Sequence, residues 1–269
     1  MYLKFVEGND EIVRVLIFRT NGNIVNLSTY NLQEIGIAKA LCIRGIQGDV
    51  MYYGGNDPTH EEEIDYNGKI IRIIWAKGVS IAGNGFFFGV EKILDEYDII
   101  QVCEYDQFYS MYLAFYSRYK GRVCMTHGPY YSPFNAKYNF KIKVIDKIWI
   151  SKKQKARIWC FAKSNYSKYF LERRGFQRIV VTGVGVDIDK FGNCDSDIQS
   201  EIDKEIRAFK GTDRLLLYIG QISDRRSTLF LINLMGELVK KDLQIKLLII
   251  GNGQKGYKQK CLSLIKKLE

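Results

Sequence analysis

Two apolar stretches late in the chain decide the fold: Leu215 to Gly220, LLLYIG, and Lys246 to Gly251, KLLIIG. Each has the length and composition of a buried strand, each stops at a glycine, and a helical stretch lies between them. This order predicts a βαβ unit whose parallel strands end at one edge of a sheet. Because two parallel strands cannot bury both faces of a sheet, we expect this domain to be incomplete.

The turns that follow these strands are suited to a phosphate group. Gly220 and the Gly251-x-Gly253 pair let a ligand approach the backbone, and the helix after a strand presents free N–H groups. Arg225 and Arg226 are placed to give a diphosphate bidentate hydrogen bonds. The same residues also fit an ordinary turn with solvated arginines, and the second glycine pair fits a simple strand end.

The rest of the chain alternates between strand and helix patterns. The expected strands are 13–18, 50–53, 70–75, 98–103, 122–126, 157–162 and 177–182. The expected helices are one capped by Asn31 and closed by Gly45, then 86–94, 107–119 and 140–155, and one from Ser164 to Gly175. This alternation predicts an α/β fold with a parallel sheet that is covered on both sides.

A shift in composition marks the domain boundary. Residues 186–213 are acidic and poor in large apolar side chains. We therefore expect a Rossmann-like domain at 1–190, a linker at 191–213 and a second, partial domain at 214–269.

The overall composition is that of a basic globular protein. The 269 residues are 46% hydrophobic and 26% charged, with a formal net charge of +10. This excess predicts an anionic partner: nucleic acid, a phospholipid surface or a phosphorylated substrate. The six cysteines are scattered and form no Cys-x-x-Cys pair, so we expect reduced thiols, a cytoplasmic protein and no metal site.

One histidine is placed for chemistry. His127 follows an apolar strand and precedes Gly128, and ligands of parallel α/β sheets bind at the carboxyl ends of strands. His127 therefore fits a catalytic position, and it also fits a loop histidine with a structural hydrogen bond. His60, which precedes three glutamates, fits a solvated loop.

A basic, aromatic belt runs from Arg118 to Arg178. It holds sixteen Lys or Arg residues and two acids, interleaved with Tyr, Trp and Phe. Within it, lysines alternate with apolar residues between Lys137 and Ile148 in an amphipathic pattern. Such a surface suits anionic lipid or a nucleic-acid backbone, and it also fits an ordinary basic surface over core aromatics.

Several segments in order resemble the family 4 glycosyltransferases of the GT-B fold, over nearly the whole chain. The matching segments are 30–41, Arg44-Gly45, Asp49-Val50, Thr126-His127-Gly128, 162–164, 183–187 with Phe191, 218–226 and 248–253. The resemblance implies two Rossmann-like domains that face a cleft, the first for an acceptor and the second for a nucleotide-sugar donor.

The resemblance also implies a mechanism and roles for residues. It implies sugar transfer with retention and without a metal or other cofactor, to a polysaccharide or glycolipid. The charge of the belt from Arg118 to Arg178, rather than the resemblance, predicts docking on the cytoplasmic face of a membrane. His127 would lie near the sugar at the reaction centre. Arg226 would replace the family's usual lysine on the donor diphosphate, beside Gly220 and Arg225, with Gly251 and Gly253 on the nucleotide side.

The chain departs from the family pattern at three places. Gln221 stands where the family has arginine, and Ser28 and Thr29 stand roughly where it has a glycine pair. The family's glutamate-containing donor motif would lie beyond Glu269. We therefore expect a truncated chain with little transferase activity by itself.

Two other functions fit the composition. A basic α/β module that binds nucleic acid without catalysis fits the charge, although no RNA- or DNA-binding motif is present, so we expect no nucleic-acid partner. Another nucleotide-dependent Rossmann enzyme also fits the alternation. A dinucleotide oxidoreductase does not, because the first strand-to-helix turn lacks Gly-x-Gly-x-x-Gly.

Overall fold

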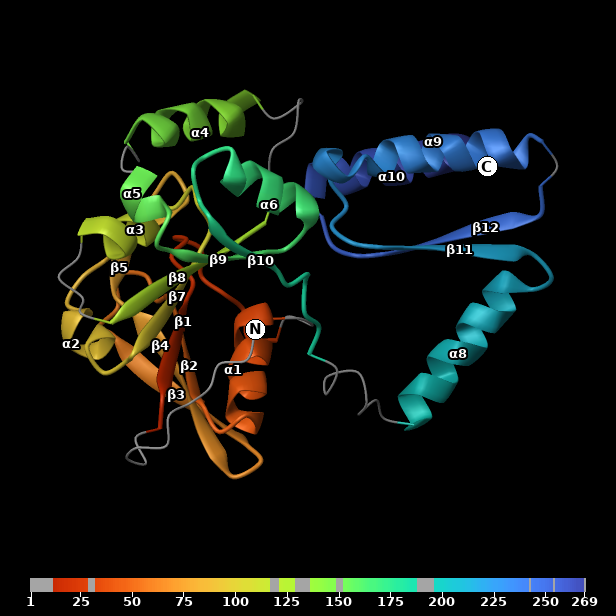
Figure 1. Ribbon diagram of the computed structural model, residues 1–269. Coiled ribbons are helices and arrows are strands. Elements are labelled where there is room, and N and C mark those ends of the chain that lie inside the picture. Colours follow the sequence, from red (N-terminus) through yellow and green to blue (C-terminus); the bar gives the residue numbers. More distant parts are fainter. Residues whose placement is uncertain are drawn as a thin grey trace. The chain divides into compact units, whose positions relative to one another are not determined.

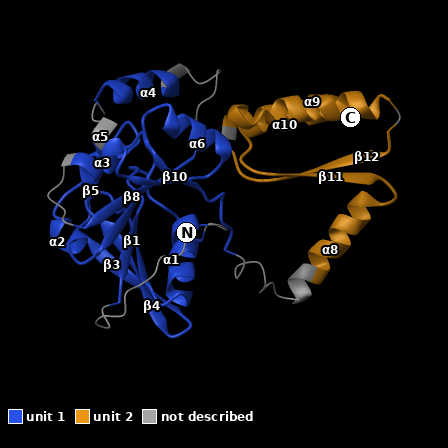
Figure 2. Ribbon diagram, viewed as in Figure 1, with its two compact units in different colours: residues 1–191 blue, residues 192–269 orange. Residues whose placement is uncertain are grey.

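The computed structural model describes residues 12–28, 32–116, 121–128, 136–148, 152–187, 196–241, 243–253 and 255–268. The chain divides into two compact units, residues 1–191 and 192–269, which we call unit 1 and unit 2 (Figure 2). Among the described residues, no helix has both the length and the apolar character needed to cross a bilayer.

Unit 1 is built on an eight-stranded sheet in the order β10-β9-β8-β7-β1-β2-β4-β3 (Figure 1). The strands are β1 Arg14–Phe18, β2 Gln47–Tyr53, β3 His60–Tyr66, β4 Lys69–Ala76, β7 Ile99–Cys103, β8 Arg122–His127, β9 Trp159–Ala162 and β10 Arg178–Val181. All neighbours are parallel except β3, which pairs antiparallel with β4 at the edge. The predicted α/β fold with a parallel sheet is confirmed.

Each face of this sheet carries its own apolar core, because successive strand residues point to opposite faces. On one face, α1 (Gln33–Ile43) packs over Ile17, Val50 and Ile73. Leu16 and Ile100 lie on the other face, beneath α4 (Ala136–Ile148) and α6 (Asn165–Glu172). Ser164 caps α6, as predicted, by accepting a hydrogen bond from the Ser167 N–H at 3.1 Å. The predicted cap of α1 at Asn31 lies outside the described residues.

The predicted helix at 86–94 is wrong. Residues 78–87 form a hairpin of β5 (Gly78–Ile81) and β6 (Asn84–Phe87), and α2 follows only at Glu91–Leu94. The turn residues Ala82 and Gly83 have φ values of 49° and 77°, as a tight hairpin turn requires. Phe87 is fixed by its edge-to-face contact with Phe18, whose ring centroid is 4.7 Å away.

Three other expectations need correction. His60 begins strand β3 rather than a loop, because the backbone of His60 to Tyr66 pairs with β4 despite its charged side chains. The helix expected at 107–119 consists of α3 (Phe108–Met111) and a π-helical turn, η1 (Tyr112–Tyr116), with 117–119 outside the described residues. The helix expected at 140–155 begins earlier, as α4, and is followed by the short α5 (Lys152–Lys155).

Unit 2 is the predicted βαβ unit with added helices. It contains α8 (Ser196–Lys210), β11 (Arg214–Ile219), the 3-10 turn η2 (Asp224–Arg226), α9 (Thr228–Val239), β12 (Ile245–Ile250) and α10 (Lys255–Leu268). The two strands are parallel, and α9 and α10 cover one face of them (Figure 1). Helix α8 occupies most of the stretch expected as a linker.

Candidate functional site

The carboxyl ends of three adjacent strands bring together a carboxylate, an imidazole and an ammonium group. Glu104 follows β7, His127 ends β8, and Lys163 follows β9. The register pairs Cys103 with Thr126 and His127 with Ala162, so these three side chains start from neighbouring points at one edge of the sheet. This is the edge at which the sequence predicts a ligand.

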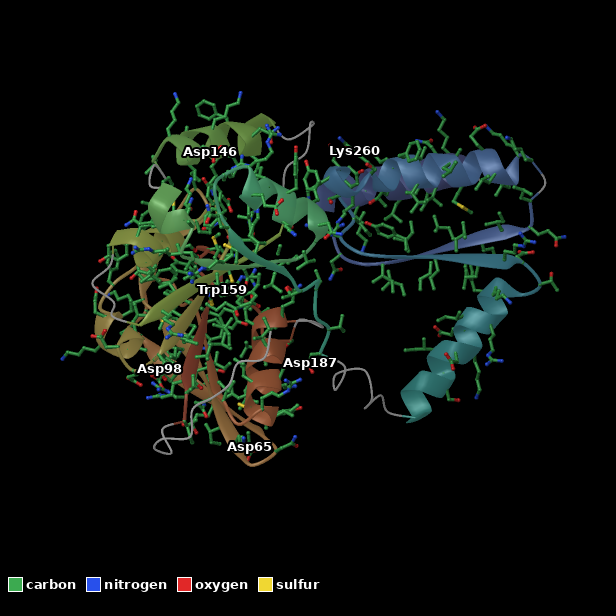
Figure 3. The ribbon with its side chains drawn as sticks, in the orientation of Figure 1. Asp65, Asp98, Asp146, Trp159, Asp187 and Lys260 are labelled. Carbon is green, nitrogen blue, oxygen red and sulfur yellow. The ribbon has the colours of Figure 1, made fainter. Side chains whose placement is uncertain are left out.

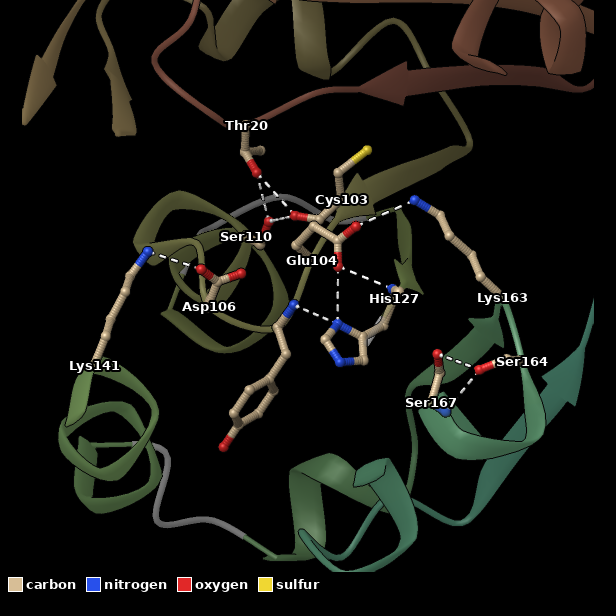
Figure 4. Close-up of polar contacts among 12 residues, drawn as sticks. Thr20, Cys103, Glu104, Asp106, Ser110, His127, Lys141, Lys163, Ser164 and Ser167 are labelled. Carbon is tan, nitrogen blue, oxygen red and sulfur yellow. Dashed lines mark hydrogen bonds and ion pairs between the residues drawn. The ribbon is translucent and has the colours of Figure 1, made fainter. Parts of the chain in front are cut away.

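Glu104 is the centre of the cluster (Figure 4). One carboxylate oxygen, Oε2, lies 2.9 Å from His127 Nδ1 and accepts the Gly128 N–H at 3.0 Å. The other, Oε1, accepts from Lys163 Nζ at 3.2 Å. Glu104 has a φ of 65°, in the left-handed region that residues other than glycine rarely occupy.

The neighbouring backbone holds Glu104 in this conformation. Its N–H donates to the Thr126 carbonyl at 2.7 Å. The preceding carbonyl, that of Cys103, accepts from Ser110 Oγ at 2.7 Å and from Thr20 Oγ1 at 3.1 Å. A strained residue that is fixed this firmly is typical of functional sites.

The contact with the Glu104 carboxylate decides which ring nitrogen of His127 carries the proton. The Tyr105 N–H also points at Nδ1, at 3.4 Å, but one nitrogen cannot accept that hydrogen and donate its own to Glu104. The shorter contact with a charged acceptor is the stronger one, so Nδ1 carries the proton. In a neutral ring, Nε2 is then a bare acceptor, and it is buried with no hydrogen-bond partner in the described part of the chain.

The charge on Glu104 is stabilised by its partners. Burial alone would raise the pKa of this carboxyl group. The hydrogen bond with His127, the Lys163 ammonium and the Gly128 N–H outweigh burial and hold the pKa of Glu104 below its ordinary value. Glu104 is therefore ionised at neutral pH.

A pocket of about 440 Å³ opens beside this cluster, entirely within unit 1. Its walls come from α1, from β7, β8 and β9 and from residues 182–187, and they include Thr126, Phe161 and Lys163. Thr126 Oγ1 is buried without a hydrogen-bond partner among the described residues. The wall of the pocket is mostly apolar and includes Lys163, whereas the Thr126 hydroxyl oxygen is buried behind it.

Residues 182–187 are tied to α1 at one side of this pocket. Asp187, labelled in Figure 3, lies 2.8 Å from Lys39 Nζ, and its side chain is almost fully buried. This ion pair fixes the pocket wall, because Lys39 belongs to α1 and Asp187 follows the last strand of unit 1.

The His127 ring does not face this pocket. Successive residues of β8 point to opposite faces, so Thr126 faces the pocket while His127 packs on Phe170 of α6, with ring centroids 4.8 Å apart. The side chain is 0% exposed. In the described structure it orients Glu104, and the catalytic role of His127 stays a prediction.

In unit 2, the turn after β11 holds three of the predicted donor-site residues. Gly220 begins the turn, buried Ile222 anchors it, and η2 carries Arg225 and Arg226. Both arginine side chains are exposed, and no ion pair involves them within the described ranges. The first turn of α9 is less open, because the Leu229 N–H donates to the Tyr257 hydroxyl at 3.3 Å.

Gly251 and Gly253 pack against this turn. The Gly220 N–H donates to the Ile250 carbonyl at 2.9 Å, and the Ile222 N–H donates to the Asn252 carbonyl at 2.9 Å. A Cβ at Gly251 would overlap the Gly220 carbonyl oxygen, and one at Gly253 would overlap that of Ile222. The structure thus brings Gly220, Gly251 and Gly253 together. Gly251 and Gly253 are glycines because another backbone segment approaches each of them closely.

Sequence reasoning missed the central residue of unit 1. Glu104 belongs to no motif, and the only available signal was a carboxylate placed directly after an expected strand. The described residues contain no group of three or more His, Cys, Asp or Glu side chains placed to hold a metal ion. The five described cysteines are free, and burial raises the pKa of Cys124 to about 12.

The comparisons with known proteins show the fold. No protein-family model and no curated protein matches the chain. A glycosyltransferase from Rickettsia africae matches it with a TM-score of 0.60 and 17% identity, over 96% of this chain and 65% of that one. A UDP-forming α,α-trehalose-phosphate synthase from Burkholderia vietnamiensis matches with a TM-score of 0.60 and 11% identity, over 96% and 70%.

Staphylococcus aureus TarM, in a complex with UDP, matches with a TM-score of 0.55 and 11% identity, over 96% of this chain and 75% of that one. The chain thus spans slightly less than two thirds of the length of the Rickettsia enzyme. The described α/β architecture is the GT-B fold of these glycosyltransferases.

Proposed function

We propose that this chain provides the acceptor domain and part of the donor domain of a glycosyltransferase that uses a nucleotide-sugar. The observation that carries the proposal is the fold match, which extends over 96% of the chain to several glycosyltransferases. Because one fold hosts many functions, the proposal also needs a site with suitable chemistry. Units 1 and 2 each supply one.

The site for the donor diphosphate is the turn after β11. Arg225 and Arg226 present exposed guanidinium groups, and Gly220 leaves the backbone accessible beside them. Positive charge at this position stabilises the diphosphate as the glycosidic bond breaks. Two of the matched structures contain UDP or UDP-2-fluoro glucose, which supports a uridine nucleotide as the first ligand to test.

The acceptor site is the pocket of unit 1. Its apolar walls, with the Lys163 ammonium group, suit a glycan or lipid-linked acceptor that has hydroxyl or phosphate groups. The reaction is the transfer of a hexose with retention to a polysaccharide or glycolipid, without a metal ion. The free cysteines fit a cytoplasmic enzyme.

Titration calorimetry with UDP tests the donor site. Arg226→Ala should lower the affinity at least tenfold, because a charge-assisted hydrogen bond to phosphate is lost. Arg207→Ala is the matched control, since Arg207 is an exposed arginine on α8 of the same unit. Failure to bind UDP or any other nucleoside diphosphate, or equal losses in the two variants, would contradict the proposal.

Sugar transfer is tested separately. The chain is incubated with labelled UDP-sugars and polysaccharide or glycolipid acceptors, with and without EDTA, and the anomeric configuration of any product is read by NMR. Because the chain provides only part of the donor domain, we expect weak transfer, with a product that retains the anomeric configuration and that also forms in EDTA. An inverted product or a requirement for a divalent metal ion would refute the corresponding part of the mechanism.

A further inference from the structure

Helix α4 has an exposed apolar stripe that nothing in the described structure covers. Phe140, Val144 and Ile148 are spaced four residues apart, so they lie along one side of the helix. Phe140 is 70% exposed, and the other two are also exposed. Lys143 and Lys147, again four residues apart, run alongside the stripe and are exposed. We call these five residues the outer face of α4.

Contacts on the opposite side of α4 hold the helix so that its outer face points to solvent. Ile142 and Ile145 are buried in the core of unit 1. Lys141 donates to Asp106 at 2.8 Å, and Asp146, labelled in Figure 3, accepts from Arg174 Nε at 2.8 Å. The helix is therefore held by apolar packing and by ion pairs on its inner side, and the outer face is not used for folding.

Helix α6, which also packs on the core beneath α4, carries exposed aromatic side chains. It meets α4 over Tyr105, whose hydroxyl donates to Asp146 at 2.8 Å and whose ring centroid lies 5.8 Å from that of Phe170. Tyr166 and Tyr169 of α6 are half exposed. Arg173, just after α6, lies over the Tyr169 ring at 5.6 Å. Each of the two helices thus exposes apolar or aromatic side chains next to cations.

We infer that the outer face of α4 binds the surface of an anionic phospholipid bilayer. Aliphatic and aromatic side chains enter the boundary between headgroups and acyl chains, tyrosine favours that boundary, and lysine and arginine pair with anionic headgroups. The two acids here do not oppose this, because Asp146 is paired with Arg174 and Glu172 lies 3.7 Å from Lys168. A nucleic acid would use the cations but would leave the Phe140–Val144–Ile148 stripe in water.

The test is flotation of the 269-residue chain with two kinds of vesicle. One kind is pure phosphatidylcholine, and in the other about one third of the lipid is phosphatidylglycerol, which supplies negative charge. The chain should bind the charged vesicles and not the neutral ones, and binding should weaken as salt is added. Equal binding to both kinds of vesicle, or to neither, overturns the inference.

Three variants locate the surface. Each lysine near an anionic membrane strengthens binding about fivefold, so Lys143→Gln with Lys147→Gln should weaken it about 25-fold. Phe140→Ser should weaken it about tenfold, because a large apolar side chain is lost from the boundary. The matched control is Lys77→Gln with Lys92→Gln, two exposed lysines elsewhere in unit 1. Tryptophan fluorescence and circular dichroism check that each variant is folded.

Two outcomes contradict this location. If the control pair weakens binding as much as the α4 pair, only net charge matters and the surface is not specific. If the chain binds a generic DNA duplex through Lys143 and Lys147 more tightly than charged vesicles, and Phe140→Ser changes neither affinity, the face is a nucleic-acid surface.

Discussion

The Glu104 carboxylate lies 2.9 Å from Nδ1 of His127, and both residues stand at the carboxyl edge of the unit 1 sheet. A residue with a positive φ thereby directs its charge towards a buried ring on one face of the sheet and a lysine on the other. The stability of this arrangement depends on the ionisation of one carboxyl group.

The first prediction concerns pH. Because the pKa of Glu104 is lowered by folding, its contribution to stability is complete above its ordinary pKa of 4.5 and is lost as pH falls through the lower, folded pKa. Glu104→Gln should therefore cost about 2 kcal/mol at neutral pH, and this difference should shrink in acid. Urea unfolding followed by tryptophan fluorescence measures it, because all three tryptophans belong to unit 1.

Glu172→Gln is the matched control for this prediction, because Glu172 is an exposed glutamate of the same unit. It should change stability by less than about 0.5 kcal/mol at any pH. If the loss in free energy of unfolding caused by Glu104→Gln stays constant or grows as the pH falls, the charge on Glu104 does not stabilise the fold.

The second prediction concerns the paired turns of unit 2. Gly251→Ala forces a methyl group against the Gly220 carbonyl and should destabilise unit 2 by about 2 kcal/mol or more. Gly256→Ala meets open space within helix α10 and should stabilise it by about 0.5–1 kcal/mol. Thermal unfolding by circular dichroism gives both values, and the tryptophan signal of unit 1 should not change. If Gly251→Ala and Gly256→Ala change the stability of unit 2 equally, Gly251 does not lie against the Gly220 carbonyl.

The third prediction concerns the pocket wall. Lys39 and Asp187 should be coupled by about 1–3 kcal/mol in a double-mutant cycle of Lys39→Met and Asp187→Asn, measured by urea unfolding of unit 1. Lys39→Met removes the ammonium group that pairs with the largely buried Asp187, so the double variant should be more stable than the sum of the two changes implies. Strict additivity would mean that residues 182–187 are held by other contacts.

The fourth prediction concerns the β5–β6 hairpin. Ala82 has a φ of 49°, a conformation that asparagine and glycine tolerate better than alanine. Ala82→Asn should stabilise unit 1 by about 0.5 kcal/mol, whereas Gly83→Ala, at a φ of 77°, should destabilise it by about 1 kcal/mol. Gly185→Ala, in open space and without a positive φ, should be neutral. Melting temperatures measured by tryptophan fluorescence rank the stabilities of the three variants. If Gly83→Ala raises the melting temperature, the positive φ described for Gly83 is wrong.

The parallel strands could be predicted because each is a short apolar run with clear ends. Strand β3 could not, since a strand with three successive glutamates forms only through pairing with β4, a contact that no local pattern reports. The β5–β6 hairpin was also missed, because its turn, Ala82-Gly83, lacks the usual Asn-Gly or Asp-Gly signal and the phenylalanines after it fit a helix equally well.

In the candidate site, too, local features could be predicted from the sequence and contacts between strands could not. The position of His127 at a strand end was predictable, because a strand end is a local feature of the sequence. The orientation of its ring and its contact with Glu104 were not, since they depend on which face of β8 the side chain takes and on an adjacent strand. Gly251 is similar. The sequence predicts a turn at this glycine, but only the folded chain shows that the Gly220 carbonyl leaves no room for a side chain there.

Strand β3 has a consequence for self-association. It is one of the two end strands of the described sheet in unit 1, opposite β10, and the free side of its backbone is a template on which a second molecule could add a strand. Glu61, Glu62 and Glu63 oppose this, because another β3 would bring carboxylates face to face. Hydrogen bonds from Arg72 lower the pKa of Glu61, and the guanidinium offsets its charge, so Glu62 and Glu63 supply most of this repulsion. We therefore expect the charged side chains of β3 to disfavour the addition of a second β3 at this edge.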